Sequence, residues 1–112
     1  MDIVKFEELR SLAFGGIGAA YAAVGDAFEN PIRLIHINNM TDQGLLISFD
    51  GATDHAFLPP RGFAVYDYAA NKDNGQTFFE QKTGAGVWVK REGAVSPAFG
   101  TVYVTAMYAA RK

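Results

Sequence analysis

The chain has 112 residues, of which 49% are hydrophobic and 20% are charged, and its formal net charge is −2. This length suits one domain with one core, and the apolar content excludes an intrinsically disordered chain. The ten basic residues are spread along the sequence, which argues against direct binding to nucleic acid. The absence of cysteine excludes disulfides and thiolate metal sites. So few charges in a small body predict that partner molecules cover part of the surface.

Residues 1–30 are expected to form an N-terminal arm or the first strands, and residues 31–112 the core of a single domain. Asp2, Glu7 and Glu8 near the start do not suit a secretory signal. The longest weakly polar run, 13–24, is about half the length needed to cross a bilayer, so no membrane span is expected. Ala19–Ala27 has the alanine content of a short helix, but the nearby glycines favour irregular, extended structure.

Gly16-Ile17-Gly18 resembles the start of a nucleotide-binding glycine loop. The third glycine and the downstream acid of that fingerprint are missing, and no strand and helix clearly flank the segment. We therefore predict no cofactor here and expect the glycines to serve flexibility or close packing.

Strand signals dominate after residue 30. Ile32–Met40 and Gly44–Asp50 are predicted to form a hairpin, since Gly44 suits a bulged turn between them. His55–Leu58 is predicted to return as a short strand that ends at the following prolines. An aromatic-rich strand is expected over Gly62–Tyr68.

Two short strands, Thr77–Gln81 and Gly86–Arg91, are predicted to precede a long final strand over Gly100–Ala110. That last run is apolar on both faces, as in a strand inside a sandwich or against a partner. The succession of short strands and turns predicts an all-β fold, either an antiparallel β-sandwich or a jelly-roll-like small barrel, with an irregular glycine-rich N-terminal segment.

The histidine, serine and carboxylate side chains are not arranged in the sequence in any pattern typical of an active site. His36 is expected to be structural, because isoleucines flank it in a strand. His55 follows Asp54, but no serine lies in a nucleophile-elbow context. Asp50, Asp54 and Asp67 offer too few oxygen ligands for a hard cation, and turn formation is the more economical role for the two in the loop. We predict no enzyme, no cofactor and no metal.

The order of the strand and turn signals resembles a group of small virion structural proteins of tailed bacteriophages. The similarity is carried by "SFDG..DH" at residues 48–55 and by the closing "GTVY" at residues 100–103, within a stretch spanning roughly residues 8–110. The resemblance implies a β-sandwich accessory protein of the virion, made in the host cytoplasm. It would either decorate the capsid or join the head to the tail, and it would contact capsid, connector or tail subunits.

From this we expect a non-enzymatic subunit of a symmetric homo-oligomeric assembly, anchored by aromatic residues at its interfaces. The candidate interface residues are Phe28, Phe63, Tyr66, Phe78, Phe79 and Tyr108. The alternative is a carbohydrate- or ligand-binding β-module that uses exposed aromatics such as Trp88.

Overall fold

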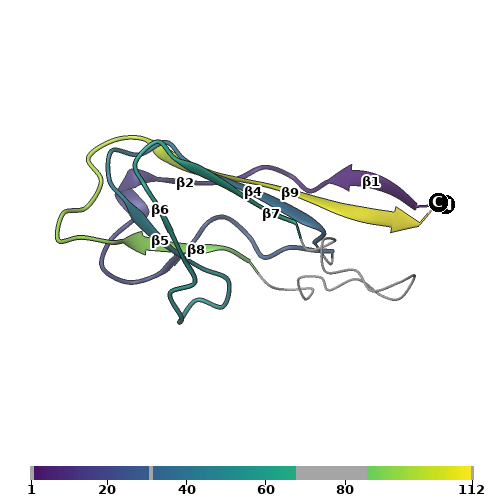
Figure 1. The fold of residues 1–112 in the computed structure, drawn as a ribbon, viewed down its shortest axis with the longest axis horizontal. Helices are drawn as coiled ribbons and strands as arrows, with labels where there is room; N and C mark the ends of the chain where they lie inside the picture. The colour runs from purple at the N-terminus through teal and green to yellow at the C-terminus, as the bar shows by residue number, and fades with distance from the viewer. Residues whose placement is uncertain (1, 31, 68–85, 112) are drawn as a thin grey trace.

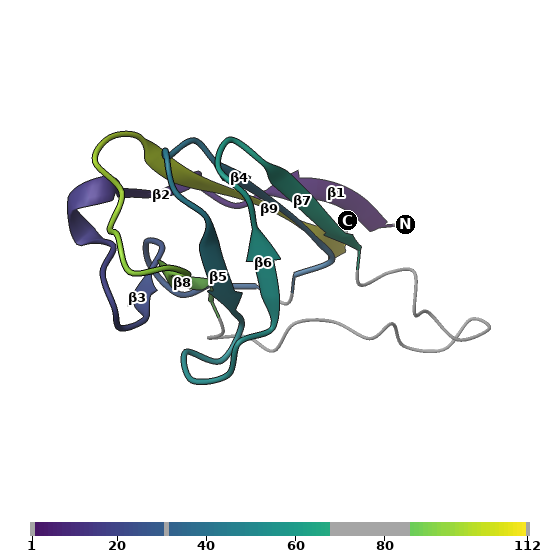
Figure 2. The ribbon, with the colours of Figure 1, turned by 60° about the vertical axis from the view of Figure 1, so that its left-hand side comes forward.

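The structure, a computed structural model, describes residues 2–30, 32–67 and 86–111. They form two antiparallel sheets packed together, so the predicted all-β sandwich is confirmed (Figures 1 and 2). The larger sheet, sheet A, contains β1 (Asp2–Phe6), β2 (Arg10–Ala13), β4 (Leu34–Asn39), β7 (Phe63–Asp67) and β9 (Thr101–Arg111). Sheet B contains β3 (Ala22–Ala23), β5 (Leu45–Ser48), β6 (Ala56–Leu58) and β8 (Trp88–Arg91). Among the described residues the one helical element is a single 3₁₀ turn, η1 (Phe14–Gly16).

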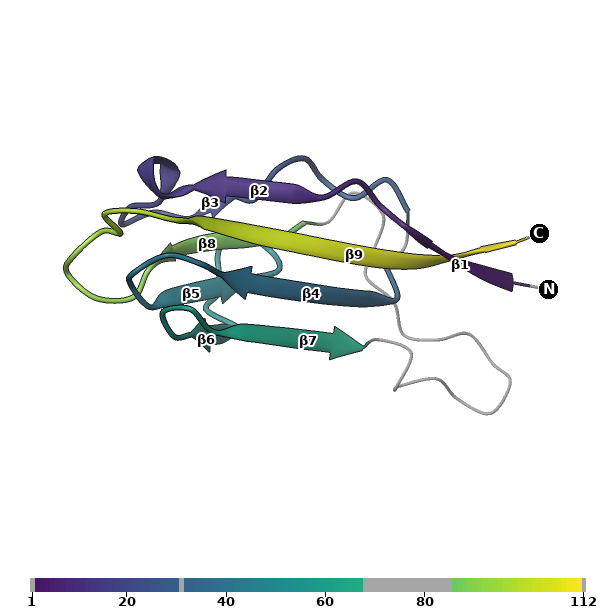
Figure 3. The same cartoon turned by 90° about the horizontal axis from the view of Figure 1, so that it is seen from above.

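The long strand β9 organises sheet A. It pairs with β4 on one side and with β1 and β2 in succession on the other, and β7 lies beyond β4 at the edge (Figure 3). The end of β9 and β1 continue past the other strands as a two-stranded ribbon (Figures 1 and 3). In sheet B the order is β3-β8-β5-β6.

The core lies between the sheets and follows the two-residue period of the strands. Alternate residues of each central strand point inward and are almost completely buried. These inward residues are Ile35, Ile37, Leu45, Ile47, Val89, Val102, Val104 and Ala106, each no more than 1% exposed. Full burial of one such large aliphatic side chain contributes about 1.5–3 kcal/mol to folding.

The predicted hairpin is wrong, because β4 belongs to sheet A and β5 to sheet B. The buried Asn39 side chain explains the change of direction: its amide NH₂ donates to the carbonyl of Gln43 at 3.0 Å. Its oxygen accepts hydrogen bonds from the Thr41 N–H at 3.0 Å and the Thr41 hydroxyl at 2.6 Å. These bonds bend the connection into a corner between the sheets.

Residues 2–30 contribute the extended strands β1, β2 and β3 to both sheets, and no α-helix forms over Ala19–Ala27, as predicted. Between Phe6↔Met107 and Arg10↔Val104 the N-terminal segment has one residue more than β9, which makes a β-bulge. The predicted strands over 86–91 and 100–110 correspond to β8 and β9. The strand predicted over Thr77–Gln81 lies outside the described residues. No helix in the described part of the chain is long and apolar enough to cross a membrane.

Candidate functional site

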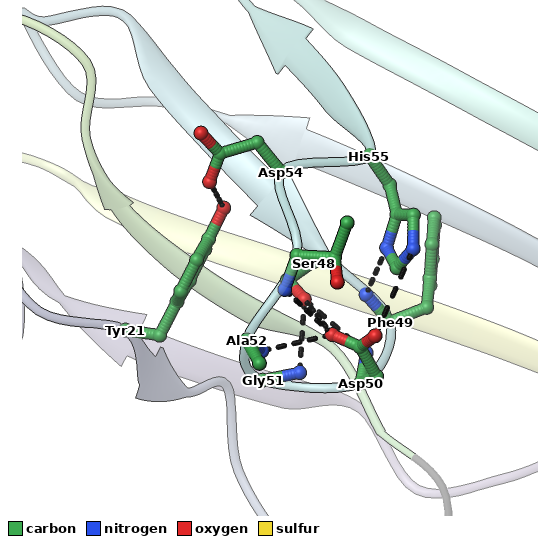
Figure 4. A network of polar contacts seen from close by, with 9 residues as sticks. Tyr21, Ser48, Phe49, Asp50, Gly51, Ala52, Asp54 and His55 are labelled. Atoms are coloured by element: carbon green, nitrogen blue, oxygen red, sulfur yellow. Dashed lines mark hydrogen bonds and ion pairs between the residues drawn. The ribbon is translucent and has the colours of Figure 1, made fainter.

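The β5–β6 loop, residues 49–55, forms a cluster of polar contacts with Ser48 at the end of β5 (Figure 4). Asp50 forms it: its Oδ1 accepts the Ala52 and Thr53 N–H groups and the Ser48 hydroxyl, each at 2.8 Å. The Ser48 oxygen in turn accepts the Gly51 N–H at 2.9 Å. The N–H groups of Thr53 and Ala52 and the hydroxyl of Ser48 lower the pKa of the Asp50 carboxyl well below its usual range. Asp50 is therefore a turn-forming carboxylate whose Oδ1 accepts three hydrogen bonds within the loop and from Ser48.

His55 closes the same loop. Its Nδ1 accepts the Phe49 N–H at 3.0 Å, and its Nε2 lies 3.9 Å from Asp50 Oδ2 (Figure 4). Within the described chain no hydrogen bond joins His55 to a hydroxyl nucleophile, and the Ser48 hydroxyl is directed at Asp50. His55 therefore holds the two ends of the loop together through its contacts with Phe49 and Asp50.

Asp54 links the loop to β3 and β8. Its carboxylate accepts a hydrogen bond from the Tyr21 hydroxyl (Figure 4). Lys90 Nζ lies 3.3 Å from the same oxygen. Lys90 also sits over the Tyr21 ring, 4.6 Å from its centroid. The hydrogen bond from Tyr21 lowers the pKa of Asp54; partial burial acts against this shift, and Lys90 adds to it. Burial and the neighbouring Asp54 carboxylate raise the pKa of Tyr21.

The carboxylates do not form a metal centre in the part of the chain that the structure describes. Asp50 and Asp54 belong to the β5–β6 loop, whereas Asp67 ends β7 in the other sheet. No group of three or more His, Cys, Asp or Glu residues in the described ranges could hold a metal ion.

Trp88 and the glycine-rich turn both make contacts within the fold. A Cβ on Gly51 would lie 3.3 Å from the Trp88 indole, so the loop backbone covers one face of that ring. Gly16 ends the 3₁₀ turn, Ile17 is buried in the core, and the Gly18 carbonyl accepts the Arg91 N–H at 2.9 Å. The glycine segment therefore connects the 3₁₀ turn to sheet B. In the described part of the chain it is not followed by the helix that a phosphate-binding loop needs.

The second candidate site is the outward side of sheet A. Three cross-strand rows cover it, and we call these residues the outer face of sheet A. The rows are Met107–Leu34–Asp67, Thr105–His36–Val65 and Tyr103–Asn38–Phe63. Asp67 is the one acidic residue in these rows, and no Lys or Arg belongs to them. The His36 ring packs against the Phe63 ring with centroids 5.6 Å apart.

Large apolar side chains protrude from this outer face. Phe63 is 68% exposed and Val65 51%, and Tyr103 is 38% exposed. At the first row a groove of about 230 Å³ is lined by Leu34, Met107, Arg33 and Asp67. The face therefore carries protruding rings, a hollow and almost no charge.

The structure separates the predicted interface residues. Phe63 lies on the outer face, but Phe28 is 3% exposed and forms part of the core. Tyr66 and Tyr108 are half-buried and pack against the core. The other two candidates, Phe78 and Phe79, lie outside the described residues.

Sequence reasoning missed Val65 and Tyr103 as surface residues. Tyr103 had a usable signal, since it alternates with the buried Val102 and Val104. Val65 had none, because β7 is apolar or aromatic at successive positions and the sequence does not show which set faces the core.

No protein-family model matches the chain, and no curated protein is significantly similar to it.

Proposed function

We propose that this protein is a non-enzymatic structural subunit of a tailed-phage virion, where it packs in a symmetric assembly on the capsid or at the head–tail connector or tail. The observation that carries the proposal is the outer face of sheet A, where Phe63 and Val65 are more than half exposed and Asp67 is the one acidic residue of the cross-strand rows, which contain no Lys or Arg.

A solvent-facing antiparallel sheet normally alternates apolar residues inside with polar ones outside. On this protein two of the three outward positions of β7 are large apolar residues: Phe63 and Val65 point out together with Asp67, while Ala64 and Tyr66 point in. Exposed apolar patches of this kind mark surfaces that bind other molecules. A protein partner would bury the aromatic anchors that interfaces favour.

The β5–β6 loop supports a scaffold role. Its Asp50 carboxylate, Ser48 hydroxyl and His55 imidazole are engaged with one another or with loop N–H groups. These hydrogen bonds hold the loop in one conformation and use Asp50 Oδ1, the Ser48 hydroxyl and His55 Nδ1 as structural groups. This loop coincides with the "SFDG..DH" segment through which the sequence resembles phage virion proteins.

The ribbon of β1 and the end of β9 also suits an assembly. A two-stranded ribbon is marginally stable by itself in water, and this one extends beyond the sandwich (Figure 3). Phe6 in the ribbon is 65% exposed and the neighbouring Leu9 57%. Contact with neighbouring subunits would cover these side chains.

Copy counting by quantitative mass spectrometry on purified particles of a phage whose genome encodes this protein tests the proposal. Hundreds of copies per particle would indicate capsid decoration, whereas about a dozen or fewer would indicate the connector or tail, whose rings have low cyclic symmetry. Absence of the protein from washed particles would overturn the virion assignment.

A further inference from the structure

We propose that the outer face of sheet A packs against the same face of a second copy of this chain. This inference deepens the proposed function because it names the partner of that face. It rests on the proposed function only for the virion as the place where the contact forms.

Charge is the first argument for a second copy. A face rich in charges of one sign would repel its own copy, whereas the cross-strand rows hold one acidic residue, Asp67 at a corner, and no Lys or Arg. A strongly basic partner would find only Asp67 as a complementary charge in those rows, and a strongly acidic partner would find none.

Shape is the second argument. A two-fold interface must be self-complementary, which requires protruding and hollow parts on one surface. Phe63 and Val65 protrude from β7, the edge strand of the described sheet, and the groove of about 230 Å³ lies over Leu34 and Met107. Phe63 lies in the third row and the groove at the first row, so the same face has both a protruding side chain and a recess.

The size of the face sets the expected strength. Three strands spaced about 4.8 Å apart present a patch smaller than the roughly 800 Å² per partner of an ordinary stable interface. We therefore expect a weak, concentration-dependent dimer that becomes fully populated only at the high local concentration of an assembly.

Sheet B provides the matched control surface. Phe57 on β6 is 53% exposed and faces outward from sheet B, where it is paired with Leu46. The same side of that sheet carries Lys90, and the Phe57 ring lies against Gly44, so it is partly engaged within the chain. A substitution at Phe57 changes an exposed ring of the same kind without touching the outer face of sheet A.

The experiment is sedimentation velocity on the full chain over a hundredfold range of concentration, up to about a millimolar. The wild type is expected to shift from monomer to dimer. Phe63→Asp should raise the dissociation constant at least about tenfold, as for an interface anchor, and Phe57→Asp should leave it unchanged. Urea unfolding checks that each variant is folded, and Thr105→Asp, in the middle row, replaces Phe63→Asp if that variant does not fold.

A wild type that stays monomeric at the highest concentration would overturn the inference, and so would an equal loss of association in Phe57→Asp. Neither result bears on the particle copy count, so the virion proposal would survive that failure. Conversely, a dimer disrupted by Phe63→Asp in a protein absent from particles would support the inference and overturn the virion proposal.

Discussion

The Glu7 carboxylate and the Arg10 guanidinium meet at 2.9 Å although they are three residues apart in a β-segment. In an unbroken strand such residues point to opposite sides of the sheet. The bulge between β1 and β2 adds one residue and turns both side chains inward, where each is less than 10% exposed. Arg10 also donates to the carbonyls of Asp26 and Ala27, and Glu7 accepts the Asn30 N–H at 3.0 Å. The pair thereby ties residues 26–30 to sheet A.

Replacing Glu7 by glutamine should lower the free energy of unfolding by about 3 kcal/mol, because the buried Arg10 would lose its counter-charge. Urea unfolding followed by circular dichroism measures this loss. The control is Glu8→Gln, which removes an exposed carboxylate next to it and should change stability by less than about 0.5 kcal/mol. Equal losses in both variants would show that the ion pair has no special role.

The same pair makes stability depend on pH. Burial alone would raise the pKa of Glu7, but the hydrogen bonds from Asn30 and the Glu29 N–H, together with Arg10, outweigh burial and lower that pKa. A carboxyl whose pKa is lower in the folded than in the unfolded state stabilises the fold above its unfolded pKa of about 4.3. That contribution is lost as the pH falls through the folded pKa.

The difference in unfolding free energy between the wild type and Glu7→Gln should therefore shrink steadily as the pH is lowered below about 5. Comparing the two proteins cancels the effect of Asp42, Asp50 and Asp54, whose pKa values are also lowered. A difference that stayed constant down to about pH 3 would contradict the assignment of the lowered pKa to Glu7.

The sequence predicts where the strands of this fold lie in the chain better than it predicts which strands pair with one another. In β9 the buried Val102 and Val104 alternate with Tyr103 and Thr105, so both the strand and its faces can be read from the pattern. Alternation does not show which strand lies beside another, and the predicted hairpin of β4 and β5 fails for that reason. The side-chain bonds of Asn39 decide the direction of the chain, and Asn-Met-Thr-Asp-Gln carries no turn signature that reveals them.

The candidate site is predictable only in part, for a related reason. Phe28 and Phe63 are equally apolar in sequence, yet Phe28 lies in an irregular segment held inside by the Arg10 guanidinium, 4.9 Å from its ring. That contact depends on a bulge far away in the chain. Phe63 and Tyr66 lie in one strand with opposite faces, and only the register with β4 shows which of them points out.

Asn39→Ala should destabilise the protein by about 2–4 kcal/mol, because the Thr41 N–H and the carbonyls of Gln43 and Pro59 would lose their buried partner. Thermal and urea unfolding measure the effect. Asn38→Ala is the matched control, since Asn38 is the same residue type one position away on the outward side of β4. If the two variants were equally stable, the corner between the sheets would not depend on the Asn39 amide.

Gly100 admits no side chain at the entry to β9. Its φ is +101°, a left-handed conformation that other residues rarely adopt, and a Cβ there would collide with the Met40 carbonyl and the Thr41 backbone. Gly100→Ala should therefore cost at least about 2 kcal/mol of unfolding free energy through strain and displacement of the β4–β5 corner. Gly93→Ala, at an exposed glycine with open space around it, should change stability by less than about 0.5 kcal/mol. Urea unfolding of both variants measures the contrast, and a Gly100→Ala protein as stable as Gly93→Ala would mean that the chain enters β9 by a different path.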